Sequence, residues 1–215
     1  MKHNHPFLVG VTGGLGSGKS SLCTILAGMG CALFEADRVA KELQLHDPEV
    51  IEGIKLLFGA AVYSCGESGK PVLDRKAVAS AVFSSAEKLE ELNRLIHPKV
   101  FTAFERAVLD AEREGVKILL KEAAILFESG GSRQLDAVVV VAADMELRVQ
   151  RAVEKGLGSR DEVMRRIATQ WPQERLIERA DYVIFNNGTF QELQTEGREL
   201  FEKLLLAAAS PRDSR

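Results

Sequence analysis

Long hydrophobic runs are absent from this chain of 215 residues. No apolar stretch approaches the ~20 residues that a membrane-spanning helix requires, so we expect no membrane partner. Residues 1–6 lead directly into an apolar, strand-like segment, and we therefore expect no signal peptide. Together these absences predict a cytoplasmic protein.

Cysteine is also scarce. The three cysteines, Cys23, Cys31 and Cys65, are odd in number and far apart, a pattern that favours neither a disulfide framework nor a zinc site. A reducing compartment is the simplest setting for such a chain. Cys23 and Cys31 lie in apolar runs, so we expect both thiols to be buried.

The chain has no excess of basic charge. Its net charge of −3 provides no global positive field, and we expect no nucleic-acid partner. A hydrophobic fraction of 46% and a charged fraction of 27% are ordinary for a globular protein. The length fits one α/β domain with small inserts. The composition indicates no clear interface patch, which favours a monomer or a weak homo-oligomer.

The sequence does contain a phosphate-binding motif. Residues 13–20 read GGLGSGKS, which matches the P-loop pattern G-x-x-x-x-G-K-[ST]. An apolar, β-prone run, Phe7–Thr12, precedes the motif, and a helix-compatible run, Lys19–Met29, follows it. A strand, a glycine-rich loop and a helix in this order are the context in which the pattern binds a nucleoside triphosphate. The alternative is an ordinary glycine-rich turn between a strand and a helix.

The glycines, the lysine and the serines of this loop each suit the binding of phosphate for a chemical reason. Glycines allow the backbone to turn tightly and to point several N–H groups into one concavity. The following helix adds its unpaired N–H groups and the positive end of its dipole. Lys19 can reach the outer phosphates, and the Ser20 hydroxyl can hold Mg²⁺. The residues expected to bind the nucleotide here are Gly14, Leu15, Gly16, Ser17, Gly18, Lys19, Ser20 and Ser21.

Five segments have the pattern of strands. They are Phe7–Thr12, Cys31–Glu35, Val116–Lys121, Ala137–Ala142 and Tyr182–Phe185. Most are continuous apolar runs, which are typical of parallel strands buried on both faces. Helical patterns separate the segments. This order predicts a three-layer α/β fold with a five-stranded, mostly parallel sheet flanked by helices.

Several residues mark the ends of helices. Asp47 followed by Pro48 predicts a helix start, and Gly59 predicts its end. Pro98 should break or kink the helical stretch that follows Ser84. Capping boxes are expected at Ser84 with Glu87, Ser159 with Glu162 and Thr189 with Glu192, and Asp144 is expected to cap a further helix.

The spacing of the strands predicts two inserts. About eighty residues separate the second strand from the third, far more than one crossover needs, so this segment should hold several helices and could form a substrate-specific lobe. Within it, residues 61–72 have the composition of a loop. A second, arginine-rich insert spans residues 148–179. We predict a nucleotide-binding core of residues 1–60, 114–147 and 180–209, a helical acceptor-binding region at 61–113 and a lid at 148–179.

Asp37 follows the second predicted strand. The carboxyl end of a strand next to the P-loop strand faces the ligand crevice in an open α/β sheet. A carboxylate there could accept a proton from an attacking hydroxyl or help to order Mg²⁺ and its waters. The alternative is an N-cap for a helix over residues 38–45. Position alone leaves both functions open.

Arg148, Arg151 and Lys155 recur at helical spacing and should line one helix face. A cationic stripe on a mobile segment can neutralise charge on a transferring phosphoryl group. The alternative is a solvated face whose arginines pair with Glu146 or Glu154. Because a P-loop is present in the same chain, the lid interpretation is favoured.

The P-loop followed by Glu35-Ala36-Asp37 resembles the dephospho-CoA kinase family, which shows T-G-G-[IL]-G-S-G-K-S and then D-A-D at this spacing. Further matches occur in order and extend the resemblance over about residues 7–193. They are Phe58-Gly59, Leu73-Asp74-Arg75, Leu92-Asn93 with Ile96-His97-Pro98, Ile125-Leu126-Phe127-Glu128, Arg166-Ile167 with Gln170, and Ala180-Asp181 with Asn186 and Gly188. The P-loop alone is common to a superfamily, whereas the ordered set is specific to this family.

The resemblance implies an activity and its cofactors. The family uses Mg-ATP to phosphorylate the 3′-hydroxyl of the ribose in dephospho-CoA, the last step of coenzyme A synthesis. Dephospho-CoA is thus the implied small-molecule partner, and ATP and Mg²⁺ are the implied cofactors. By matched position, Asp37 takes the base role and contacts the acceptor, while Lys19 acts on the phosphates as a second catalytic residue.

The resemblance also implies the remaining site residues. Arg75 and His97 would belong to the acceptor-binding lobe, although a histidine before a proline is often structural. The arginine-rich insert, with Arg148 and Arg151, would form the lid over ATP. Asn186 would lie near the adenine.

Several residues depart from the family pattern. Glu35 replaces the first aspartate of D-A-D, Glu122 stands where aspartate is usual, and Ala124 stands where proline is usual. Each glutamate keeps the charge but adds one methylene, which alters the expected metal-water geometry. Ser21 replaces the commoner threonine. Lys121, at the end of an apolar strand, has no explanation in the sequence.

Three other functions compete with this interpretation. The first is another small-molecule or nucleotide P-loop kinase. The second is a nucleotide switch, although a GTPase is expected to carry an N-K-x-D segment. The third is a non-catalytic binder of coenzyme A, which the substitutions at Glu35 and Glu122 keep open.

Overall fold

The computed structural model describes residues 5–66 and 69–210. The chain divides into two compact units, one made of residues 1–35 and 107–215 and the other of residues 36–106. Among the described residues, the first unit contains a five-stranded sheet and the second a two-stranded sheet.

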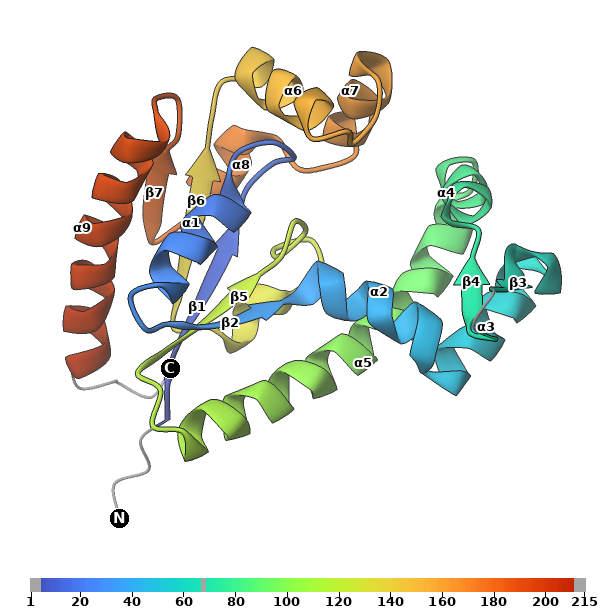
Figure 1. Cartoon of the computed structure of the whole chain (residues 1–215), viewed down its shortest axis with the longest axis horizontal. Coiled ribbons are helices and arrows are strands. Elements are labelled where there is room, and N and C mark those ends of the chain that lie inside the picture. The colour runs from blue at the N-terminus through green and yellow to red at the C-terminus, as the bar shows by residue number, and fades with distance from the viewer. Residues whose placement is uncertain (1–4, 67–68, 211–215) are drawn as a thin grey trace. The chain divides into compact units, whose positions relative to one another are not determined.

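A parallel sheet forms the centre of the first unit (Figure 1). Its strands are β1 (Phe7–Thr12), β2 (Ala32–Glu35), β5 (Ile118–Glu122), β6 (Ala137–Ala142) and β7 (Tyr182–Phe185), in the order β2-β5-β1-β6-β7. Every neighbouring pair runs parallel. The predicted α/β fold with a five-stranded parallel sheet is confirmed, and the strand ends differ from the predicted ones by two residues at most.

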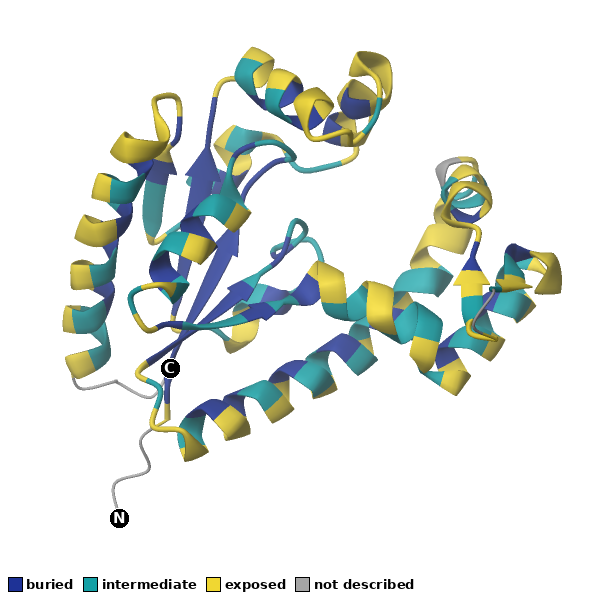
Figure 2. Cartoon of the chain, viewed as in Figure 1, coloured by how far each residue is buried: buried dark blue, intermediate teal, exposed yellow. Residues whose placement is uncertain are grey.

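These strands are apolar because both faces of the sheet are covered. β1 and β6 are buried along their whole length, as the dark blue strands in Figure 2 show. Helices α1 (Lys19–Ala27) and α9 (Phe190–Ala209) pack on each other and against one face. The core that these two helices form with the sheet includes Leu22, Cys23, Leu26, Leu120, Val139, Val141, Leu200 and Leu204. Each leucine or valine side chain of this core contributes about 1.5–3 kcal/mol when fully buried.

The two predicted buried thiols, Cys23 and Cys31, do belong to this core. On the opposite face, the side chains of Leu126 and Leu135 pack directly over Gly10. A Cβ at Gly10 would lie 2.6 Å from a terminal methyl of each leucine, so a larger residue would force these side chains to move.

The predicted lid region forms three short helices within the first unit. They are α6 (Met145–Glu154), α7 (Arg160–Ala168) and α8 (Gln173–Ile177), and a short 3₁₀ turn, η2 (Gly131–Gln134), precedes β6. The capping box at Ser159 and Glu162 is present and starts α7. The box at Thr189 and Glu192 likewise starts α9. Asp144 precedes α6 as expected, but its side chain accepts a hydrogen bond from Asn187 Nδ2 at 3.0 Å.

The second unit is mainly helical. Its elements are α2 (Ala36–His46), α3 (Pro48–Phe58), η1 (Ala60–Val62), β3 (Tyr63–Cys65), β4 (Pro71–Leu73), α4 (Arg75–Phe83) and the first part of α5 (Ala86–Arg113). Asp47 caps α3 as predicted, because its carboxylate accepts hydrogen bonds from the N–H groups of Glu49 and Val50. Lys99 on α5 forms an ion pair with Asp47 at 3.2 Å, which connects the two helices.

Two local predictions in this unit are wrong. The segment predicted as a loop over residues 61–72 contains the antiparallel pair β3 and β4, in which Tyr63 lies opposite Leu73. The expected capping box at Ser84 does not start α5, because Ser84 is the C-cap of α4. Ser85 instead accepts a hydrogen bond from the N–H of Lys88 at 3.3 Å.

Of the break or kink predicted at Pro98, the break is wrong, because helix α5 continues through this residue. The residues Ile96, Val100, Phe104 and Val108 are buried at spacings of four, and packing of this stripe outweighs the hydrogen bond that proline removes. In the described part of the chain, no helix has both the length and the apolar character needed to cross a membrane.

The boundary between the units differs from the predicted one. The predicted nucleotide-binding core includes residues 36–60, whereas in the structure α2 and α3 belong to the second unit and pack on each other and on its η1 and β4. The reason is that β2 leads into α2 without a loop, so the chain leaves the sheet at Glu35. The function of this unit in binding an acceptor stays a prediction.

Lys121 lies within β5, in register between Gly10 of β1 and Phe34 of β2, and is 2% exposed. Burial lowers the pKa of its ammonium from 10.5 to about 8. A lysine whose pKa falls on folding carries a stability cost that is full below pH 8 and fades as the pH rises towards 10.5.

We therefore expect Lys121→Met to raise the midpoint of thermal unfolding at pH 7 by at least about 2 °C, the effect of roughly 1 kcal/mol in a chain of this size. The advantage should shrink near pH 10, where the wild-type amine is largely neutral. Lys117→Met, at an exposed position just before β5, is the control. A gain that is the same at both pH values would contradict burial of the charge as the cause.

Candidate active site

The P-loop connects the carboxyl end of β1 to α1, as the motif predicts. The N–H of Ser17 donates to the Gly14 carbonyl at 3.1 Å, which closes a tight turn with Leu15 and Gly16 at its centre. Gly16 has a φ of 78° and lies against the backbone of Arg148, where a Cβ would come within 2.1 Å of the Arg148 carbonyl oxygen. Glycine at this position is therefore required by both conformation and space.

Lys19 is the first residue of α1, and its side chain extends back to the P-loop backbone. Its Nζ donates to the carbonyl oxygens of Gly13, at 2.9 Å, and Gly14, at 3.3 Å. The ammonium is thus held over the concavity of the loop, where the outer phosphates of a nucleotide would be placed.

Ser20 and Glu122 form the polar pair next to the P-loop. The Ser20 hydroxyl donates to Glu122 Oε1 at 2.7 Å. Glu122 ends β5, and its register partner on β2 is Glu35. One hydroxyl and two carboxylates therefore lie at neighbouring positions at one end of the sheet, and oxygen ligands of this kind are those that Mg²⁺ prefers. Ser21 is half-buried in the first turn of α1.

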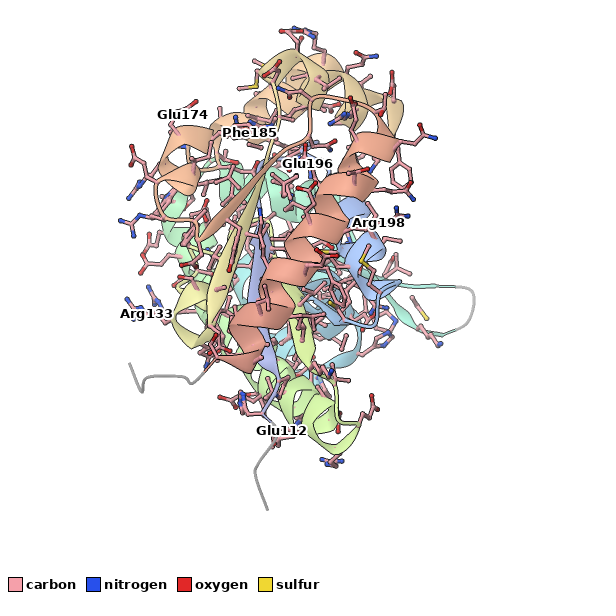
Figure 3. All side chains as sticks on the ribbon, turned by 90° about the vertical axis from the view of Figure 1, so that its left-hand side faces the viewer. Glu112, Arg133, Glu174, Phe185, Glu196 and Arg198 are labelled. Carbon is pink, nitrogen blue, oxygen red and sulfur yellow. The ribbon has the colours of Figure 1, made fainter. Side chains whose placement is uncertain are left out.

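Arg148 is a buried residue and not part of a solvated helix face. It is 4% exposed, its Nε donates to the Leu15 carbonyl at 3.1 Å, and a Cβ on Gly14 would lie 1.9 Å from its Nη2. Burial lowers the pKa of the guanidinium, and the carboxylate of Glu174 on α8 (Figure 3) opposes this shift. The result is a partly desolvated cation placed against the phosphate-binding turn.

Arg151 and Asn186 form a second contact with the loop. Arg151 Nη1 donates to the Asn186 carbonyl at 2.8 Å. Asn186 is buried, and its Nδ2 donates to the Ser17 carbonyl at 2.8 Å. A Cβ on Gly18 would lie 2.1 Å from this nitrogen. The side-chain amide of Asn186 therefore holds the P-loop backbone at Ser17. The expected position of Asn186 near an adenine stays a prediction.

Glu146 and Glu154, the acidic residues that could pair with a solvated arginine face, bond to other residues in the structure. Both carboxylate oxygens of Glu146 accept from Arg160 Nη2, at 2.8 and 2.9 Å, and Glu154 accepts from Gln150. Arg148 and Arg151 both bond to backbone carbonyls at the P-loop and the β7–α9 connection. Lys155 is exposed at the C-terminus of α6.

The predicted acceptor residues belong to the second unit. Asp37 is exposed in the first turn of α2, which begins at Ala36, so it lies inside the helix and not at its N-cap. Arg75 is the exposed first residue of α4, and its neighbour Asp74 caps that helix through hydrogen bonds from Lys76 and Ala77. His97 is half-buried in α5, and burial lowers the pKa of its imidazole.

The structure adds contacts for two residues that the sequence leaves without a partner. The sequence connects Glu122 with the metal-water geometry only through its departure from the family pattern, and in the structure its carboxylate accepts a hydrogen bond from the Ser20 hydroxyl. Gln170 was named only as part of a motif, yet its side-chain carbonyl accepts from the Leu15 N–H at 2.9 Å. The signal in the sequence was the motif position for Gln170 and the departure from the usual aspartate for Glu122, and neither signal indicates what the side chain contacts.

Comparison with known protein sequences gives the same family throughout. The model of the dephospho-CoA kinase family matches residues 7–192. A dephospho-CoA kinase from Chlorobaculum tepidum is 59% identical over 205 residues, covering 95% of this chain and 98% of the relative. Another, from Chlorobium chlorochromatii, is 59% identical over 208 residues, covering 97% of this chain and 98% of the relative.

Solved structures support the fold. A crystal structure of a Thermus thermophilus protein matches with a TM-score of 0.77 at 30% identity, covering 93% of this chain and 98% of the other. The structure of dephospho-CoA kinase from Campylobacter jejuni matches with a TM-score of 0.67 at 23% identity, covering 93% and 97%. The family model and the relatives at 59% identity each span almost the whole chain. This protein therefore belongs to the dephospho-CoA kinase family.

Proposed function

We propose that this kinase transfers the γ-phosphoryl group of ATP to the 3′-hydroxyl of the ribose of dephospho-CoA, giving coenzyme A and ADP. The observation that carries the proposal is the P-loop surrounded by Lys19, Arg148 and the pair of Ser20 with Glu122, in a chain that the family model covers over residues 7–192. A role in coenzyme A synthesis in the cytoplasm is part of the same proposal.

The nucleotide half of the proposal rests on the first unit. Within residues 14–21, N–H groups other than those of Leu15 and Ser17, which bond within the protein, would hold the phosphates. Lys19 would exchange its bonds to the Gly13 and Gly14 carbonyls for phosphate oxygens. Arg148 and Arg151 already lie at the loop, so their positive charge is available without a large rearrangement. Asn186 would bring the adenine next to the connection that follows β7.

Magnesium fits the donor set at the end of β5. The Ser20 hydroxyl would be a direct ligand, and Glu122, with Glu35 beside it, would order the water around the ion. When bound, the ion neutralises charge on the phosphate oxygens. The additional methylene at Glu122 is compatible with this arrangement because its carboxylate accepts a hydrogen bond from the Ser20 hydroxyl at 2.7 Å.

The acceptor half of the proposal rests on the second unit. Asp37 would accept the proton of the attacking hydroxyl while the oxygen bonds to the γ-phosphorus and the bond to the leaving ADP oxygen breaks. Asp37 is two residues after Glu35, the last residue of β2, so chain connectivity alone keeps it close to the carboxyl end of this strand. Arg75 and His97 would contact the acceptor. Catalysis would come mainly from positioning and from charge stabilisation.

Glu122→Gln is expected to raise the Mg²⁺ concentration for half-maximal activity by about 10–100-fold, the usual effect of losing a group that orients a metal ligand. The amide can still accept from Ser20, so thermal stability should change little. Glu154→Gln, at an exposed position on α6, is the matched control. An unchanged Mg²⁺ requirement in Glu122→Gln would exclude this carboxylate from the metal site.

Residues 148–170 are expected to show slower hydrogen exchange when an ATP analogue binds, because arginines of this region, including the exposed Arg165 of α7, would gain phosphate partners. Peptides from α9 provide the internal reference. Protection that is unchanged at saturating analogue would mean that this region does not act as a lid.

The experiment that tests the proposed function measures ADP formation with and without dephospho-CoA. We expect rapid ADP formation only when the acceptor is present. Equal rates in both conditions would indicate a nucleotide hydrolase. Acceleration by another alcohol or nucleotide, but not by dephospho-CoA, would indicate a different small-molecule kinase, and binding without turnover would indicate a non-catalytic protein.

A further inference from the structure

Leu15, at the tip of the P-loop turn, contacts the lid helices through its side chain. Its side chain packs against the small apolar cluster formed between α6 and α7. The cluster consists of Val149 and Ala152 from α6 and Val163 and Ile167 from α7, which are all at most 8% exposed. A leucine from the phosphate-binding loop thus completes the core of the helix pair.

The peptide groups of Leu15 also contact the lid region from both sides. The N–H donates to Gln170 Oε1 at 2.9 Å, and the carbonyl accepts from Arg148 Nε at 3.1 Å. Gln170 lies two residues after the end of α7, and its own N–H donates to the Ile167 carbonyl. One lid helix therefore supplies the donor, and the segment after the other helix supplies the acceptor.

These contacts orient the turn that binds phosphate. The N–H and the carbonyl of Leu15 belong to two consecutive peptide planes, each held by one of these bonds, so neither plane can rotate without breaking its bond. Both planes lie within the turn of Gly14 to Ser17. The same contacts determine where α6 places Arg148 and Arg151. Movement of the lid helices and a change of P-loop conformation are therefore coupled at Leu15.

We propose that Gln170 and the side chain of Leu15 are positioning residues that hold the lid helices in register with the P-loop. Neither side chain need touch the reacting atoms. They act by aligning the P-loop peptide groups and the lid arginines with the same phosphates. This inference rests on the proposed phosphoryl transfer and extends it to the residues that couple the lid to the nucleotide.

Trp171 provides a reporter for this coupling. It is the sole tryptophan of the sequence and follows Gln170 directly. Its N–H donates to Glu128 Oε1 at 3.2 Å, and its ring lies 6.2 Å from the Phe127 ring and 3.4 Å from the Arg175 guanidinium carbon. Any displacement of the segment after α7 changes these contacts, so tryptophan emission should respond to it.

The test compares Gln170→Ala with Gln173→Ala. Gln173 makes the same kind of bond, since its Oε1 accepts from the Ala143 N–H at 3.0 Å, but it does not contact the P-loop. In Gln170→Ala we expect kcat to fall about tenfold, in line with the loss of one hydrogen bond that holds the transition-state arrangement. The KM for ATP should change less than threefold, and more than one ADP should form per phosphorylated acceptor because water enters. Gln173→Ala should keep a ratio of one and nearly wild-type kcat.

Two further variants separate positioning from simple loss of structure. Gln170→Glu retains an acceptor for the Leu15 N–H and should restore the product ratio towards one. Leu15→Ala removes the side chain that packs against the cluster between α6 and α7 and should behave like Gln170→Ala. The change in Trp171 emission on adding a non-hydrolysable ATP analogue should be lost in Gln170→Ala although the analogue still binds.

The inference and the proposed function fail in different ways. If the wild-type chain does not phosphorylate dephospho-CoA, the proposed function is wrong, and the emission change still tests the coupling. If the wild-type chain is active and Gln170→Ala keeps the wild-type product ratio and emission change, the positioning role is wrong. Equal losses in Gln170→Ala and Gln173→Ala would also overturn it, because they would indicate a general structural effect.

Discussion

An Asp37→Asn variant is expected to turn over dephospho-CoA about 10²–10⁴-fold more slowly than the wild-type protein, the usual contribution of a general base. Asparagine has the same size, but its amide cannot accept the hydroxyl proton. Asp37 is exposed and lies inside the first turn of α2, so its loss should cost the helix only the ~0.3–1 kcal/mol of a favourable dipole interaction. ATP affinity and thermal stability should be nearly unchanged.

Glu87→Gln is the matched control for this prediction. Glu87 is also an exposed acidic residue in the first turn of a helix of the second unit, so its replacement removes a similar dipole interaction. Its turnover should equal that of the wild type. If Asp37→Asn lowers stability and yet retains activity per folded molecule, Asp37 has a structural role and the base is another group.

Lys19→Ala is expected to reduce turnover by about 10²–10³-fold, the effect of removing one preorganised group that stabilises developing charge. In the structure, the Lys19 ammonium lies over the carbonyls of Gly13 and Gly14, in the concavity of the loop. The backbone N–H groups remain in the variant but cannot neutralise the phosphate charge by themselves.

The fold of Lys19→Ala should persist, because the sheet and the α1–α9 core do not depend on this side chain. Lys203→Ala, at an exposed position on α9, controls for the loss of one surface charge and should be fully active. Normal turnover in a well-folded Lys19→Ala protein would contradict the assignment of the P-loop as the phosphate site.

The large sheet could be predicted because burial on both faces makes the sequences of its strands almost entirely apolar. β1 and β6 are buried on both faces, and such strands are continuous apolar runs that stand out between helical patterns. The weak points were short or irregular elements. β3 and β4 have three residues each, too few to show an alternating pattern among glycine and polar residues. Pro98 is tolerated because tertiary packing of α5 decides the outcome, which local propensity does not show.

In the candidate site, too, some features could be predicted from the sequence and others could not. The P-loop is contiguous, so its residues and their order are visible in the sequence. The bond of Ser20 to Glu122 joins residues 102 positions apart, and that of Leu15 to Gln170 joins residues 155 positions apart. Such contacts depend on strand register and on helix packing, which only the folded chain defines. The buried position of Arg148 belongs to this class too, since its spacing with Arg151 and Lys155 equally allowed a solvated face.

The central claim is tested most directly by following the γ-phosphoryl group itself. Wild-type protein would be incubated with γ-labelled ATP and dephospho-CoA, and the product would be located by mass spectrometry and phosphorus NMR. We predict one label on the ribose 3′-hydroxyl of the product for each ADP formed. Label found only in inorganic phosphate, or on another position of the acceptor, would contradict the account.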